Sequence, residues 1–204
     1  PDVENQIDKI RVEGAVLDCP ETASIAIYLK SASKLKKHLY QSSENLLIRK
    51  NLDFDTLDNL LAYISKYVSD DGTFRDENVK ELSTIRSRIS SVNKKLSGIV
   101  SHYANDSKYS GFLQEGFSTM RDNRVVLSLK ENFRGRIKGI SHGSSSTGMT
   151  IYLEPVEMFE LNNEITELEE RYGQEIHKIL KALTSEIRDK LEIDKPEKGI
   201  IFIQ

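Results

Sequence analysis

The chain has 204 residues, a formal net charge of −3 and a hydrophobic content of 38%. The hydrophobic content is enough for a core. The negative net charge argues against a protein that binds polyanions over its whole surface. Charged residues make up 30% and aromatic residues 7% of the sequence, a composition typical of solvated helices. The single cysteine excludes an internal disulfide, and no apolar run reaches the ~18 residues of a membrane span, so we expect a cytoplasmic protein with no membrane partner.

Residues 1–80 are expected to form a helical core subdomain. Apolar residues recur there at roughly helical spacing, at Ile25, Leu29, Leu35 and Leu39. A second apolar stripe between Leu57 and Val68 predicts another helix. Asp71-Gly72 then predicts a tight turn that closes a short hairpin.

A stricter pattern follows in residues 81–120, which we expect to form the first helix of a lever. Its apolar residues recur at alternating intervals of three and four, at Leu82, Ile85, Ile89, Val92, Leu96, Ile99 and Tyr103. This heptad seam predicts one helix of a coiled coil. Such a helix needs a partner, because a lone amphipathic helix cannot bury its apolar stripe.

Residues 156–192 supply a matching seam and are expected to form the returning lever helix. Its apolar positions are Leu161, Ile165, Leu168, Tyr172, Ile176, Ile179, Leu183 and Ile187. If the two helices pair antiparallel, they form a coiled coil about 45 Å long at ~1.5 Å per residue. Residues 121–155 then lie at its tip, and residues 193–204, which do not continue the helical pattern, form a tail.

The tip, residues 121–155, has the pattern of a small basic β-element. Three short strands are predicted from apolar alternation at Val125, Leu127 and Leu129, at Ile137–Ile140, and at Met149, Ile151 and Leu153. Alternation places the cations on one face, where they can pair with phosphates. The candidate nucleic-acid-binding residues are Arg121, Arg124, Lys130, Arg134, Arg136, Lys138 and His142. Alternatively, these charges solvate an exposed sheet and pair with Asp122, Glu131 and Glu154.

These elements together predict a mainly α fold. It consists of a helical core subdomain and a long antiparallel coiled-coil lever arm, which carries a small antiparallel β clamp at its tip.

No residue constellation supports catalysis, so we expect this chain not to be an enzyme, with no catalytic residues, cofactor or metal site. The phosphate-loop motif G-x-x-x-x-G-K-[ST] is missing, and the segment Gly143–Gly148 lacks the required lysine, which favours a turn between strands. The four histidines lack metal-ligand spacing. Ser144 with His142 lacks the G-x-S-x-G elbow of a nucleophile, and we expect His142 to stabilise a turn by hydrogen bonding.

Several short motifs follow one another in a fixed order through the tip, at Arg121-Asp122-Asn123-Arg124, Arg134-Gly135, and Gly139-Ile140 with His142. They resemble the R-x-x-R, R-G and G-I-x-H segments of the MutS-type-two family, bacterial relatives of the mismatch-repair protein MutS. The segment Ser144 to Pro155 is similar to its S-x-S-G-x-T-x-F-I-E-P run, and Leu161-Asn162-Asn163-Glu164 to its L-N-N-E. Two departures are Ser128, where the family has proline, and Gly143, where it usually has an acid.

The resemblance implies that the chain is a fragment covering the core, lever and clamp of such a protein. The family binds branched or recombination-intermediate DNA to suppress homologous recombination, and it binds collided ribosomes to split them. It does so with an ATPase domain, which uses ATP and Mg, and a Smr endonuclease domain, whose motifs this sequence lacks. The expected partners are therefore branched DNA, the ribosome or both, in a protein that is a homodimer at full length and associates with the nucleoid or ribosomes.

Two functional hypotheses remain open from the sequence. The first is a nucleic-acid clamp at the basic tip. The second is a coiled-coil dimerisation or protein-interaction module without direct nucleic-acid contact, because heptad seams can also pair between chains.

Overall fold

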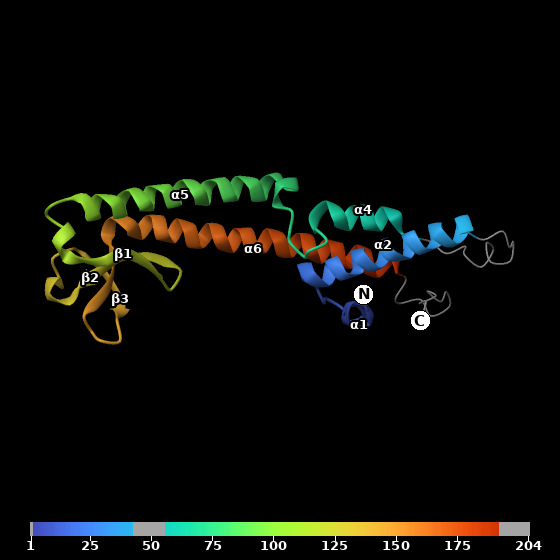
Figure 1. Ribbon diagram of the computed structural model, residues 1–204, viewed down its shortest axis with the longest axis horizontal. Coiled ribbons are helices and arrows are strands. Elements are labelled where there is room, and N and C mark those ends of the chain that lie inside the picture. The colour runs from blue at the N-terminus through green and yellow to red at the C-terminus, as the bar shows by residue number, and fades with distance from the viewer. Residues whose placement is uncertain (1, 43–55, 192–204) are drawn as a thin grey trace. The chain divides into compact units, whose positions relative to one another are not determined.

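The computed structural model describes residues 2–42 and 56–191, and the fold is mainly α, as the sequence predicted (Figure 1). The chain divides into two compact units, one of residues 1–80 with 174–204 and the other of residues 81–173. The predicted tail, 193–204, lies outside the described residues.

The first unit is built from helices. They are α1 (Glu4–Arg11), α2 (Cys19–Ser42), α4 (Asp58–Tyr67), a 3₁₀ turn (Asp76–Asn78) and the second half of α6 (Val156–Lys190). The helix predicted between Leu57 and Val68 is confirmed as α4. The predicted hairpin is confirmed too, because Val68 pairs antiparallel with Phe74 and Gly72 has a φ of +80° in the turn.

Helix α2 begins where its sequence supplies a capping box. The Asp18 side chain accepts a hydrogen bond from the Glu21 amide at 2.8 Å, and the Glu21 side chain accepts one from the Asp18 amide at 2.8 Å. The core of this unit includes fully buried residues of α1, α2, α4 and α6, among them Ile10, Ile25, Ile64, Leu183 and Ile187.

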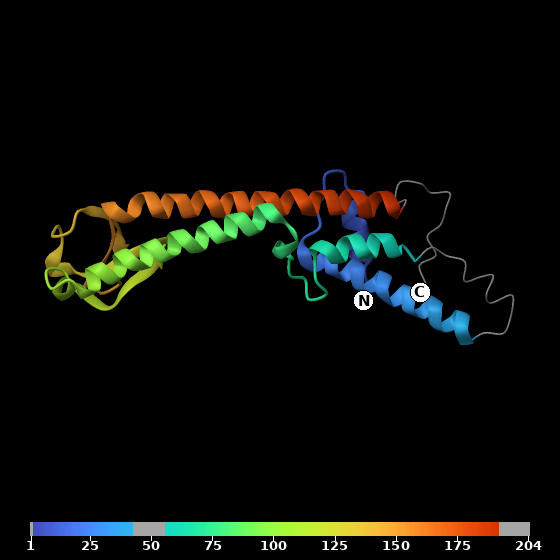
Figure 2. The same ribbon diagram turned by 90° about the horizontal axis from the view of Figure 1, so that it is seen from above.

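In the second unit, α5 (Lys80–Asn105) and the first half of α6 lie side by side and antiparallel (Figures 1 and 2). Two ion pairs mark the direction. Arg171 of α6 contacts Glu81 at 2.8 Å, whereas Glu164, which comes earlier in α6, contacts Arg88, which comes later in α5, at 2.5 Å. The positions Val92, Leu96 and Ile165 of the two predicted seams are buried in one apolar cluster.

The first helix is shorter than predicted, because α5 ends at Asn105 and not near residue 120. Asp106 ends it by accepting a hydrogen bond from the Lys108 amide at 2.8 Å, an Asx turn that competes with the helical bonding pattern. After a 3₁₀ turn (Ser110–Phe112), the chain enters strand β1 (Leu113–Arg121), which the sequence did not predict.

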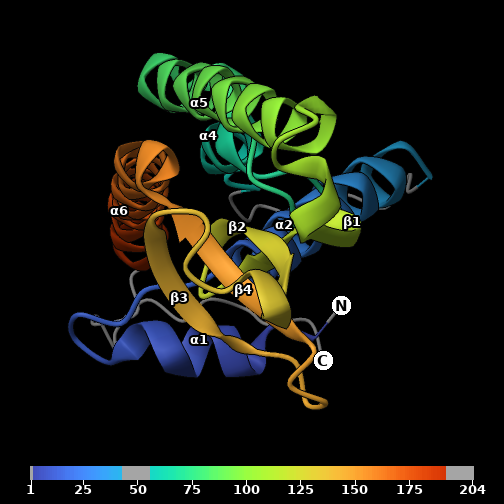
Figure 3. The same cartoon turned by 90° about the vertical axis from the view of Figure 1, so that its left-hand side faces the viewer.

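Four antiparallel strands form the sheet of this unit, in the order β1-β2-β4-β3 (Figure 3). The other three are β2 (Arg124–Lys130), β3 (Gly139–Ser144) and β4 (Thr150–Pro155), near the predicted runs. The two residues between β1 and β2, Asp122 and Asn123, have φ values of +49° and +59°, as a two-residue hairpin turn requires.

One face of the sheet packs on the helices. Leu127 and Leu129 of β2 pair across the strands with Leu153 and Ile151 of β4, and all four are buried in one cluster with Met158 of α6. Alternation turns Ser128 and Lys130 of β2 and Thr150 and Tyr152 of β4 towards the opposite face, which is called the outer face below.

Close backbone approach at Gly139 gives a first testable prediction. A Cβ added there would lie 2.1 Å from the carbonyl oxygen of Glu154, so Gly139→Ala must shift β3 away from β4. We expect it to lower the free energy of unfolding by about 1–3 kcal/mol in urea titrations. Gly98→Ala is the control: no atom outside its own turn lies within 4 Å of its added Cβ in α5, so it should be neutral or stabilising by up to ~1 kcal/mol. Equal effects of the two changes would contradict the prediction.

Candidate functional site

The best-defined polar cluster of the sheet is centred on Glu154 of β4, whose side chain is fully buried. Its Oε2 accepts hydrogen bonds from Arg124 Nε at 2.9 Å and from His142 Nε2 at 2.8 Å, and its Oε1 accepts one from Asn162 Nδ2 at 2.7 Å. Three strands and helix α6 thus contribute to one buried carboxylate.

Asn162 and Asn163 extend this cluster along α6. The Asn162 side chain pairs with both backbone groups of Val125 at 3.0 Å, accepting from its amide and donating to its carbonyl. The guanidinium of Arg124 donates to Asn163 Oδ1 and lies 5.2 Å from the Phe159 ring centroid. These contacts fasten β2 to the helix, so the motif residues of the cluster hold the sheet in place.

At Glu154, hydrogen bonds and the nearby positive charge lower the pKa by more than burial raises it. Burial alone raises the pKa of a carboxyl group, but hydrogen bonds from Arg124, Asn162 and His142 together with the nearby guanidinium charge hold the pKa of Glu154 below its ordinary value. The group is therefore an ionised carboxylate at neutral pH, which is the state that its three donors require.

The seven predicted binding residues do not form one group in the structure. Arg124 and His142 belong to the buried cluster, with side chains only 16% and 15% exposed. Arg121 pairs across the strands with Arg124, and its guanidinium lies 4.0 Å from the ring centroid of Tyr152. Lys130 lies at the other end of β2, about 20 Å from Arg124 at ~3.3 Å per residue, and donates to the Gly111 carbonyl at 3.0 Å.

The other three cations lie together in the segment 134–138, here called the basic loop. Arg134, Arg136 and Lys138 are exposed, whereas Ile137 is buried in the sheet's core cluster and anchors the loop. Arg134 Nε contacts Glu131 at 3.0 Å. Within the described parts of the chain, Arg136 and Lys138 have no ion-pair partner. Three cations thus face solvent on a fixed loop.

Sequence reasoning assigned Arg124 to phosphate binding because a sequence shows charge but not burial. The signal for its observed contacts was present in Glu154-Pro155 and Asn162-Asn163, which the family pattern picked out together. The contact between Arg124 and Glu154, which are 30 residues apart, agrees with the alternative interpretation, in which the tip's charges pair with acids such as Glu154.

The segment Gly143–Gly148 comprises the end of β3 and the turn that leads to β4, in agreement with the predicted turn between strands, and no helix follows it. Among residues 2–42 and 56–191, no group of three or more metal-ligating side chains occurs. In the same residues, no helix is long and apolar enough to cross a membrane.

Comparison with known proteins gives consistent relatives, although no family model matches the chain. The chain is 34% identical over 198 residues to an endonuclease MutS2 of Maridesulfovibrio salexigens, covering 92% of the chain and 25% of the relative. It is 32% identical to that of Lacticaseibacillus casei, covering 85% and 22%, and 28% identical to that of Aquifex aeolicus, covering 92% and 25%. The chain thus spans about a quarter of the length of the curated relatives it matches.

Proposed function

Because this chain belongs to the MutS2 family, we propose that it is the core, lever and clamp portion of such a protein and that its sheet contacts nucleic acid. In this proposal α5 and α6 are the lever, and the four-stranded sheet is the clamp. The observation that carries it is the basic loop. Three exposed cations within five residues, on a loop fixed by Ile137, suit the phosphates of a nucleic-acid backbone.

The seven candidate residues divide between two roles in this proposal. The exposed cations Arg134, Arg136 and Lys138, with Arg121 and Lys130 on the sheet, contact phosphate oxygens. Arg124 and His142 act through Glu154 and keep the strands in register, so they position the contact surface without touching the ligand.

For the whole protein we propose the activities of the family. These are binding of branched DNA to suppress recombination, binding of collided ribosomes to split them, homodimer formation, and association with the nucleoid or ribosomes. ATP with Mg and the nuclease chemistry belong to domains outside this sequence. The turn Gly143–Gly148 does not fit a nucleotide, since it has no lysine and no following helix to receive phosphates, and no step of the proposed contact passes through ATP.

The proposal is tested by neutralising the basic loop. We expect the triple variant Arg134→Gln, Arg136→Gln and Lys138→Gln to bind branched DNA and ribosomal RNA more weakly. The slope of log K against log salt should fall by about 2–3, because each lost phosphate contact contributes ~0.7–0.9. Fluorescence anisotropy at several salt concentrations measures both effects.

The matched control removes the same charge elsewhere. Lys34→Gln, Lys37→Gln and Lys181→Gln neutralise three exposed lysines of the first unit and should leave the slope unchanged. The proposal fails if the two triple variants bind alike, or if the unaltered chain shows no salt-sensitive binding.

The dimerisation hypothesis has weaker support, because residues of the two seams are buried against one another within a single chain. Sedimentation separates the hypotheses: a dimer that persists at high salt and binds no nucleic acid supports the interaction module.

A further inference from the structure

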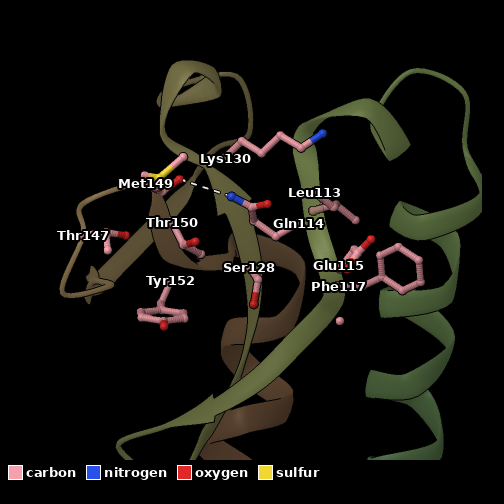
Figure 4. A pocket seen from close by; sticks show the side chains of 11 residues that line it. Leu113, Gln114, Glu115, Phe117, Ser128, Lys130, Thr147, Met149, Thr150 and Tyr152 are labelled. Atoms are coloured by element: carbon pink, nitrogen blue, oxygen red, sulfur yellow. Dashed lines mark hydrogen bonds between the residues drawn. The ribbon is translucent and has the colours of Figure 1, made fainter.

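The outer face of the sheet contains a groove of about 870 Å³, one of whose lining residues is the proposed phosphate contact Lys130 (Figure 4). Its floor is formed by residues of β2 and β4, including Ser128 and Tyr152. In Figure 4, Tyr152 and Phe117 of β1 lie on opposite sides, with Ser128 between them. The volume lies within the range of small-ligand sites, about 300–1,000 Å³.

Two irregular segments of backbone build the walls. Gly116 has a φ of +82°, and the register of β1 against β2 shifts between Leu113 and Ser118, so this part of β1 bulges out of the sheet. The opposite wall is the turn before β4, which Ser145 ties to Thr150 through backbone and side-chain hydrogen bonds of 2.9 and 3.2 Å. The groove is therefore formed by the fold itself.

Across one end, the Gln114 side chain donates to the Met149 carbonyl at 3.3 Å (Figure 4). This bond joins β1 to the β3–β4 turn, so both walls are held relative to one another without a ligand.

The lining combines apolar surface with positive charge. Phe117 is 47% and Met149 67% exposed, so both present apolar surface to the groove. Lys130 lines the groove, and Arg121 lies beside it, 4.0 Å from the ring centroid of the lining residue Tyr152. The lining also contains one carboxylate, Glu115, which can accept a hydrogen bond from an exocyclic amino group of a base.

We propose that this groove accepts an unpaired nucleobase of single-stranded nucleic acid, stacked on Tyr152, with the flanking phosphates paired to Arg121 and Lys130. Aromatic rings beside cations are the surfaces on which single strands bind, because every base has a stacking face and every nucleotide a phosphate. A base inside a duplex is already stacked and cannot enter. This inference rests on the proposed function, to which it adds a subsite for unpaired nucleotides.

The test compares four fluorescein-labelled probes: a strand of about 15 thymidines, the same strand with abasic residues at its centre, the corresponding uridine strand, and a duplex of that length. The thymidine and abasic strands carry the same phosphates, so their difference isolates the base. We expect the chain to bind thymidine at least about fivefold more tightly than the abasic strand.

Substitutions at Tyr152 connect that difference to the groove. Tyr152→Leu should abolish it while leaving duplex affinity unchanged, and Tyr152→Phe, which keeps the ring, should retain it. Phe117→Leu is a second lining variant and should reduce it. Tyr63→Leu, at an exposed tyrosine of α4, should have no effect.

The tighter of the thymidine and uridine strands identifies the source, DNA or RNA. Equal binding of thymidine and abasic strands, or equal losses by Tyr152→Leu on all probes, overturns the inference. If the chain binds the duplex in a salt-sensitive way but binds the thymidine and abasic strands equally, only the subsite for unpaired nucleotides is overturned. If it binds none of the probes, the proposed function is overturned as well.

Discussion

Glu154→Gln is expected to lower the free energy of unfolding by about 3–5 kcal/mol, because it leaves the buried Arg124 guanidinium without its charge partner. The substituted amide keeps the shape of the carboxylate, so packing changes little. The glutamine NH₂ group would face hydrogen-bond donors, and the single amide oxygen can accept fewer hydrogen bonds than the three that Glu154 accepts. Urea denaturation followed by circular dichroism measures the loss.

Glu164→Gln provides the control. It breaks the ion pair between Glu164 and Arg88, whose side chains are 30% and 50% exposed, so the cost should stay below about 1 kcal/mol. Similar losses for the two variants would show that the Glu154 cluster is no stronger than a surface pair.

The pH dependence of stability gives the same variant a second readout. The folded pKa of Glu154 is lowered, so the unfolded chain takes up this proton at a higher pH than the folded chain does. Its contribution is fully present above the ordinary carboxyl range and is lost as the pH falls through the lowered folded pKa. Glu154→Gln should therefore flatten the acid limb of the stability curve, and an unchanged acid limb would contradict the assignment.

Arg124→Gln is expected to separate folding from binding. The change leaves Glu154 as a buried carboxylate without its guanidinium partner, so we expect a loss of about 3–5 kcal/mol in stability. Under conditions where the variant remains folded, the salt slope of nucleic-acid binding should stay at the unaltered value, since Arg124 touches no phosphate in the proposal.

The basic-loop variant should show the reverse: a lower slope with stability changed by less than about 0.5 kcal/mol, because its side chains are exposed.

A double variant at Arg124 and Glu154 measures the energetic coupling between the two side chains. It should lose less stability than the two single changes combined, by ~0.5–3 kcal/mol, because the second change removes an already unpaired charge. A reduced salt slope of nucleic-acid binding for Arg124→Gln would show that Arg124 itself contacts phosphate.

The spacing of apolar residues along the sequence predicted the long helices. The interval of three and four between Leu82 and Tyr103 located α5, because a helix that buries one stripe repeats its apolar residues at that spacing. Strands β2 and β4 followed in the same way from alternation on a sheet with one buried face.

Strand β1 escaped prediction for a physical reason. Its pairing with β2 is interrupted at Gly116, so apolar residues such as Phe117 and Met120 do not alternate with buried positions and are exposed. The groove was missed with it, because one wall is this bulge. Pairing of the tip's charges with Glu154 was only one of two interpretations from the sequence, because the burial that selects Arg124 and His142 as its partners depends on contacts between segments far apart in the sequence.

The junction between sheet and helix has a mechanical consequence. Strand β4 ends at Pro155 and α6 begins at Val156, so no connecting residue separates them, and the Val156 amide also bonds to the Lys138 carbonyl at 3.3 Å. Residues 106–112, by contrast, separate α5 from β1. A rotation of α6 about its own axis is therefore transmitted directly to β4 and, through the Val156–Lys138 hydrogen bond, to the end of the basic loop, whereas α5 is joined to β1 only through the residues between them.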